Sequence, residues 1–143
     1  MRLVVDASTL VAEALRKRGR ELLAHPELDL VVAAAWNEAA HELRRRVAQL
    51  VAHGHLEQAT AMRLLDEVLA TLPMLVTIVP AAVSDPFLEQ AYRRVPRDPN
   101  DAPTVALALA LECGIWTADH DFFGCGVAVW TTETLRLHLM EMA

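Results

Sequence analysis

Six acidic residues lie at points along this chain where carboxylates could share a metal ion. They are Asp6, Glu38, Asp98, Asp101, Asp119 and Asp121. Carboxylates gathered at one place repel one another unless a cation lies among them, and hard oxygen ligands of this kind suit Mg²⁺ or Mn²⁺. A cation held in this way would orient a water molecule and stabilise charge that develops on a phosphoryl oxygen. The residue types therefore indicate metal-assisted chemistry on a phosphate ester.

The elements that must position these acids follow from the hydrophobic pattern. Short, continuous apolar segments predict buried strands at residues 3–5, 30–33, 76–79, 115–118 and 127–130. Helical periodicity predicts a helix from Trp36 to Val51, one over 56–72 that ends at Pro73, one from Asp101 to a C-terminal cap at Gly114, and one that starts near Thr132. Strands that alternate with helices in this way predict an α/β fold, in which a parallel sheet is covered by helices on both faces.

The acids should meet at one edge of that sheet. Asp6 directly follows the first strand, and Asp119 directly follows the fourth. Glu38 and Asp101 fall in the first turns of helices. In a doubly wound sheet, the carboxyl ends of the strands share one rim with the amino ends of the following helices, and ligands bind there, where the direction of winding reverses. We therefore expect the acids to form one cluster.

Each acid also has a purely structural explanation. Asp6 and Asp101 would serve as N-caps of the helices that follow them. Glu38 would interact favourably with the dipole of its helix, and Asp119 and Asp121 would be turn residues. Capping accounts for part of the pattern, but acids at four separate junctions favour a shared site.

Length and composition predict a single folded domain over residues 1–143, with 54% hydrophobic residues. No apolar run reaches the ~20 residues that would span a bilayer, and the N-terminus does not resemble a signal peptide, so we expect no membrane association. The two cysteines match no disulfide scaffold or zinc motif, which favours a cytoplasmic setting.

The net charge of −6 argues against simple electrostatic binding of nucleic acid. Divalent cations at the acidic rim would offset that charge locally.

In the order and spacing of four segments, the chain resembles a PIN domain. The segments are residues 4–8 (VVDAS), Glu38, residues 98–103 (DPNDAP) and residues 116–119 (WTAD). PIN domains are metal-dependent nucleases, and the small bacterial ones include the VapC-like toxins of toxin–antitoxin pairs. The resemblance covers nearly the whole chain. It implies a three-layer α/β/α sandwich with a central, mostly parallel five-stranded sheet in the order 3-2-1-4-5.

The resemblance also implies which residues act. The family's four acids fall on Asp6, Glu38, Asp101 and Asp119, as catalytic residues and metal ligands. Asp98 and Asp121 match the family's pattern less closely and would support or substitute for these ligands. Ser8 and Thr117 match small hydroxyl residues that the family has beside its first and fourth acids.

The activity implied is that of a metal-dependent endoribonuclease, which hydrolyses RNA phosphodiester bonds with Mg²⁺ or Mn²⁺, as the toxin component of a bacterial toxin–antitoxin system. Its partners would be the RNA substrate, an antitoxin protein and a second copy of the chain in a homodimer. One metal ion and two metal ions both remain compatible with the sequence. The alternative is a catalytically silent PIN-like binding or scaffold module, and the complete set of acids weighs against it.

Three basic clusters could contact the phosphates of a nucleic acid, at residues 16–20, 44–46 and 93–97. We expect the first and third in loops that border the rim, and the second on a solvated helix face. His53 and His55 are expected to be loop residues without a metal-ligand role. Among the remaining residues, we expect three buried tryptophans and an exposed thiol: Trp36, Trp116, Trp130 and Cys125.

Overall fold

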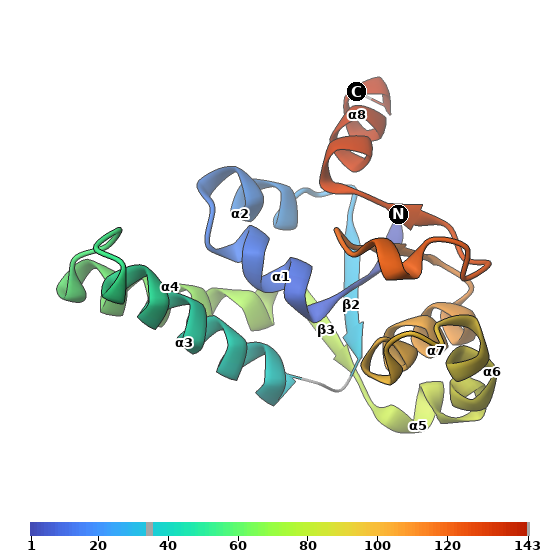
Figure 1. The fold of residues 1–143 in the computed structure, drawn as a ribbon. Helices are drawn as coiled ribbons and strands as arrows, with labels where there is room; N and C mark the ends of the chain where they lie inside the picture. Colours follow the sequence, from blue (N-terminus) through green and yellow to red (C-terminus); the bar gives the residue numbers. More distant parts are fainter. Residues whose placement is uncertain (34–35, 143) are drawn as a thin grey trace.

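Five parallel strands form the centre of the fold in the computed structural model, which describes residues 1–33 and 36–142 and leaves the side chain of Trp36 undescribed (Figure 1). The strands are β1 (Arg2–Val5), β2 (Asp29–Ala33), β3 (Val76–Val79), β4 (Gly114–Trp116) and β5 (Val129–Trp130). Their order in the sheet is β3-β2-β1-β4-β5, and every pairing is parallel. This order confirms the expectation, although β4 and β5 are shorter than the apolar segments that predicted them.

The central strand β1 marks the point where the winding of the sheet reverses. The chain adds β2 and β3 on one side of β1 and then returns to add β4 and β5 on the other. Val5 of β1 pairs with Trp116 of β4, so the residues that follow these two positions emerge side by side at the same edge. This edge is where a doubly wound sheet binds its ligands.

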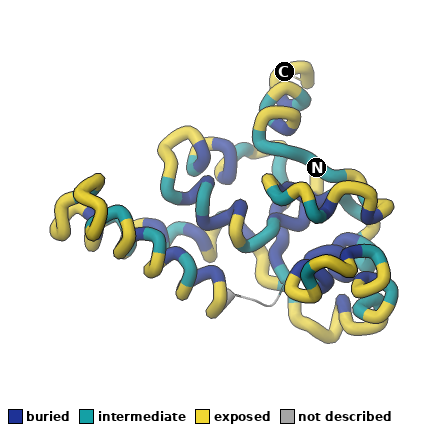
Figure 2. The backbone as a smooth tube through the Cα atoms, in the orientation of Figure 1, coloured by how far each residue is buried: buried dark blue, intermediate teal, exposed yellow. Residues whose placement is uncertain are grey.

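Helices cover both faces of the sheet and produce a three-layer α/β/α sandwich. One face carries α1 (Ala7–Ala14), α2 (Lys17–Leu23), α3 (Trp36–Ala52), α4 (Gln58–Leu75) and α8 (Thr132–Met142). The other face carries α6 (Leu88–Arg94) and α7 (Ala102–Leu111), with the short α5 (Ala81–Ser84) packed against α7. Figure 2 shows the buried segments concentrated in the strands and in the inward sides of these helices. Alternate residues of β1 supply the two cores: Leu3 and Val5 face one, and Val4 faces the other.

Two helix ends differ from the prediction. Pro73 lies inside α4, which continues to Leu75. A proline removes one backbone hydrogen bond, but Pro73 is exposed and falls in the last turn of the helix, where the burial of Leu72 and Val76 holds the chain in place.

The second difference concerns Gly114, which was predicted to cap α7. The cap is Glu112, in the left-handed conformation with φ 53°, and the N–H of Cys113 donates to the carbonyl of Ala108 at 3.1 Å. Gly114 is instead the first residue of β4. A Cβ there would lie 3.1 Å from the carbonyl oxygen of Ala128, so the glycine allows close approach of the neighbouring chain segment.

Residues 16–20 also differ from the prediction, because they belong to a helix and not to a loop. Arg16 is the N-cap of α2, and Arg20 donates from Nη1 to the carbonyl of Ala14 at 3.0 Å, at the end of α1. Gly19 is buried between these helices, and a Cβ there would collide with the backbone carbonyl of Glu13.

Replacing Gly19 by alanine is therefore expected to force α1 and α2 apart and to lower the free energy of unfolding by about 1–3 kcal/mol. Arg18→Ala, an exposed change on the same helix, serves as the control and should stay within about 0.5 kcal/mol of the wild type. Urea unfolding followed by circular dichroism measures both values. Equal stability of the two variants would show that the α1–α2 contact is looser than the structure indicates.

None of the helices in the described residues is long and apolar enough to cross a membrane.

Candidate functional site

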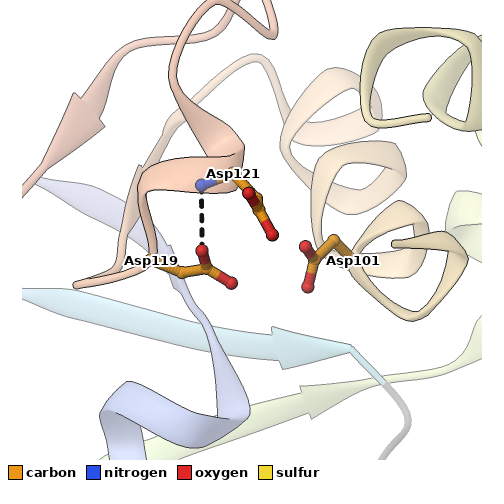
Figure 3. A group of neighbouring side chains, drawn as sticks. All are labelled: Asp101, Asp119 and Asp121. Carbon is orange, nitrogen blue, oxygen red and sulfur yellow. Dashed lines mark hydrogen bonds between the residues drawn. The ribbon is translucent and has the colours of Figure 1, made fainter. Parts of the chain in front are cut away.

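Two short 3-10 turns bring three carboxylates together at the carboxyl edge of the sheet (Figure 3). Asp101 ends the turn Pro99–Asp101 that leads into α7, while Asp119 and Asp121 belong to the turn that follows β4. One oxygen from each of the three carboxylates lies within 4.8 Å of the others. The N–H of Asp121 donates to Oδ1 of Asp119 at 2.9 Å, which fixes the turn and directs both side chains toward Asp101.

Asp101 is the most unusual member of this cluster. It is only 8% exposed, and its Oδ2 is a buried oxygen with no hydrogen-bond partner among the described residues. Burial, and then the neighbouring carboxylates of Asp119, Asp98, Asp6 and Asp121, raise the pKa of Asp101 to about 7. A buried carboxylate oxygen without a partner is costly, and a bound cation would satisfy it. The donor set, composed of carboxylate oxygens, therefore fits a hard divalent cation such as Mg²⁺ or Mn²⁺.

Asp6 lies beside this cluster, directly after β1. Its Oδ2 accepts a hydrogen bond from the Thr117 hydroxyl at 3.2 Å. Burial raises the pKa of Asp6 above its ordinary value, the Thr117 hydrogen bond opposes this, and the Asp119 carboxylate raises the pKa further. Asp6 and Asp101 line the same cleft, and Asp6 and Asp119 line its continuation.

The capping explanation holds for some of these acids and not for others. Asp98 accepts the N–H of Asn100 at 2.9 Å, and Asp119 accepts that of Asp121, so both are N-caps of 3-10 turns. Asp101 also occupies an N-cap position, but in the described structure its carboxylate makes no capping hydrogen bond. The carboxylate of Asp6, at the N-cap of α1, accepts the Thr117 hydroxyl, and the backbone N–H groups of Ser8 and Thr9 also lower its pKa.

Glu38 lies in the first turn of α3. It is exposed and lines the same cleft as Asp6 and Asp101, to which Asn37 and Asn100 also contribute. We refer to this cleft and its continuation beside Asp119 as the acidic cleft. The structure thus brings Asp6, Glu38, Asp101 and Asp119 to one cleft, but within the described residues the tight group is completed by Asp121 and not by Glu38.

Two threonines position the acidic residues. Thr117 is 1% exposed; its hydroxyl donates to Asp6 and accepts the N–H of Asp119 at 3.0 Å, so it bridges the ends of β1 and β4. The Thr9 hydroxyl accepts the N–H of Ala118 at 3.0 Å and holds the same loop from α1. The sequence did not lead us to predict a positioning role for Thr9. Its hydroxyl lies in the first turn of α1, close to Asp6, and that position could have indicated the role.

Replacing Thr117 by valine keeps the shape of the side chain and removes both hydrogen bonds. We expect the affinity of the site for Mn²⁺ to fall about 10- to 100-fold, as is typical when a group that orients a metal ligand is lost. Thr117→Ser retains the hydroxyl and should keep most of the affinity. Titration calorimetry with Mn²⁺ measures the effect, and wild-type affinity in the valine variant would contradict a positioning role for this hydroxyl.

The third basic cluster also proves to be largely structural. Arg93 and Arg94 lie in α6 and not in a loop. Arg93 pairs with Glu89 at 3.2 Å, and Arg94 donates to the carbonyl of Cys125 at 2.8 Å. Arg97 does reach the rim, where it lies 3.5 Å from Asp121.

The burial of the tryptophans and of Cys125 can be compared with what the sequence predicted. Trp116 is fully buried, as predicted, whereas Trp130 is only partly buried and packs against His138. Trp36 lies outside the residues whose side chains are described. The Cys125 thiol is 2% exposed, so the prediction of an exposed thiol was wrong; its segment folds back onto the core beside α6.

Comparison with known proteins agrees with this architecture. A family model described as PIN domain matches residues 4–140. The crystal structure of PAE2754 from Pyrobaculum aerophilum is similar to this chain, with a TM-score of 0.66 and 20% sequence identity. The match covers 99% of this chain and 90% of that chain, and at this identity it concerns the fold alone. A search of curated proteins finds no match.

Proposed function

Because this chain belongs to the PIN-domain family, whose members are generally nucleases that use divalent metals, we propose that it is an Mg²⁺- or Mn²⁺-dependent endoribonuclease. The observation that carries the proposal is the cluster of Asp101, Asp119 and Asp121, in which Asp101 also has a buried oxygen without a hydrogen-bond partner among the described residues. Such a group is destabilising in the absence of a cation. Its presence at the switch point of the sheet is typical of a binding site.

The ligands of the cation would be Asp101, Asp119 and Asp121, with Asp6 beside them. A divalent cation supplies Lewis acidity toward a phosphoryl oxygen and lowers the pKa of a bound water. Thr117 keeps the carboxylates of Asp6 and Asp119 in place through its two hydrogen bonds. Glu38, which is exposed and lines the same cleft, would orient the attacking water or help to hold a second cation.

We further propose that the protein is the toxin of a bacterial toxin–antitoxin pair. The support is the resemblance of four segments of this PIN domain to VapC-like proteins. An antitoxin would inhibit the enzyme by covering the acidic cleft. A homodimer is compatible with α8, on which Leu137 and Met140 are exposed apolar residues.

Cleavage of a labelled single-stranded RNA tests the proposed activity. We expect cleavage with Mn²⁺ or Mg²⁺, none with excess EDTA, and none by Asp119→Asn with either metal. Mn²⁺ titration calorimetry on the same samples separates a nuclease from a silent module. Binding of no cation together with no cleavage would overturn the proposal and favour the scaffold alternative.

A further inference from the structure

The acidic cleft continues into a second groove between α1 and α3, which pack side by side (Figure 1). Ala12 and Arg46 line the part of the acidic cleft beside Asp6 and Asp119, and the same two residues line the start of the groove. The groove has a volume of about 570 Å³, and beyond Arg46 its walls are Leu15, Arg16, Gln49, Leu50, His53 and His55. We call it the α1–α3 groove. Arg46 therefore stands at the junction of the two spaces.

Arg46 is held at this junction by hydrogen bonds to two helices. Its Nε donates to Oε1 of Glu42 at 3.0 Å, and its Nη2 donates to the hydroxyl of Ser8 at 3.1 Å. A guanidinium group carries five N–H donors, and across the described part of the chain the other three of Arg46 have no hydrogen-bond partner. The side chain is thus fixed in position and still has donors available for a ligand. This distinguishes Arg46 from Arg45, whose guanidinium is exposed and paired only with Glu42.

The charge of the α1–α3 groove is opposite to that of the acidic cleft. Its ionisable lining residues are Arg16, Arg46 and two histidines, and its described lining includes no carboxylate. Hydrogen bonds from Arg45 and Arg46 lower the pKa of the adjacent Glu42 to about 2, so Glu42 is ionised and pairs with both arginines. The positive charge of the α1–α3 groove comes from Arg16 and Arg46, which line it, and not from Arg45, which does not. A polyanion that is repelled by the metal-free acids would be attracted here.

We propose that the α1–α3 groove binds the RNA strand on one side of the scissile phosphate, with Arg46 contacting the adjacent phosphate and Arg16 a phosphate further along. This inference rests on the proposed ribonuclease activity, since it takes RNA as the substrate. Leu15 and Leu50 give the groove apolar surface against which bases can pack, and His53 and His55 offer rings at its far end. The histidines thus gain a use that their loop position alone did not suggest.

Binding of a fluorescein-labelled single-stranded RNA, measured by anisotropy in EDTA over a series of salt concentrations, tests this inference separately from catalysis. Each lost phosphate contact should lower the slope of log Kd against log salt by about 0.7 and weaken binding several-fold, so we expect these changes for Arg46→Ala and for Arg16→Ala. Arg45→Ala removes an arginine from the same helix and the same Glu42 pair, and it should leave both values unchanged. Arg46→Lys keeps the charge and should retain most of the binding.

Several outcomes would overturn the inference. These are unchanged RNA binding by both alanine variants, an equal loss for Arg45→Ala, or no RNA binding by the wild-type protein in EDTA despite cleavage in Mn²⁺. Loss of a co-purifying protein partner by Arg46→Ala with unchanged RNA binding would identify the groove as a protein-docking site instead. Binding through the groove without any cleavage in Mn²⁺ would overturn the proposed activity and leave the groove assignment standing. Circular dichroism confirms that each variant is folded.

Discussion

Asp101→Asn is expected to abolish metal-dependent cleavage while it makes the metal-free protein more stable. Loss of a charged ligand in a preorganised site should lower kcat about 10³-fold. At the same time the change removes a buried, unpartnered carboxylate that four other acids repel. One pKa unit corresponds to about 1.4 kcal/mol, and solvent screening in an open cleft reduces the expected gain in unfolding free energy to about 1–2 kcal/mol.

Asp66→Asn provides the matched control. Asp66 is exposed on α4, away from the acidic cleft, so neither activity nor stability should change. Cleavage assays and thermal melts in EDTA measure the two effects on each variant. A destabilised Asp101→Asn protein would mean that this carboxylate has a structural role, and full activity would remove Asp101 from the site.

The second large effect is a dependence of stability on pH and metal. The pKa of Asp101 rises from an ordinary 3.8 to about 7 on folding, so the folded state binds this proton more tightly than the unfolded chain does. The stability that the protonated group provides is fully present below pH 3.8 and is lost as the pH rises toward 7. Burial also raises the pKa of Asp6, so ionisation of Asp6 likewise lowers the stability of the folded state as the pH rises. The stability advantage of Asp101→Asn over the wild type should therefore be absent near pH 4 and complete above pH 7.

A divalent cation should offset the stability that is lost when Asp101 ionises. Because it binds the folded, ionised cluster and not the unfolded chain, saturating Mn²⁺ at pH 7.5 is expected to raise the Tm of the wild-type protein by several degrees, on the order of 2–3 kcal/mol at 100 times Kd. Asp101→Asn should show little of this shift. Melts at pH 5 and pH 7.5, with and without Mn²⁺, test both statements. A metal-induced shift of equal size in the two proteins would place the cation elsewhere.

The positions of Asp6 and Asp119 could be predicted because each depends on a short stretch of sequence, an apolar strand followed directly by an acidic residue. The apolar segments 3–5 and 115–118 are followed directly by Asp6 and by the Asp119 turn, and parallel pairing then brings the two ends together. Sequence alone did not rank Asp121 above Glu38 in the tight cluster. That order depends on how the turn after β4 directs its side chains, which is a matter of tertiary geometry.

The roles of the basic residues, in contrast, could not be predicted from the sequence. Arg16–Arg20 and Arg93–Arg97 were taken for loops because charge obscured the helical pattern, yet Arg20 and Arg94 bond to backbone carbonyls and serve the fold. Arg46 was assigned to a solvated face, because its neighbours Arg44 and Arg45 look the same in sequence. Only the bond to Ser8, which lies 38 residues away, distinguishes it.

The central position of β1 in the sheet determines when the acidic cluster can assemble during synthesis of the chain. The first acid to be synthesised, Asp6, is bridged by Thr117, which lies 111 residues later in the chain. Closing so long a loop is slow compared with the formation of local helices. We expect a nascent chain to have no assembled acidic cluster until the segment that contains Thr117 has left the ribosome. The proposed ribonuclease would therefore be inert toward its own messenger while the chain as far as Thr117 is being synthesised.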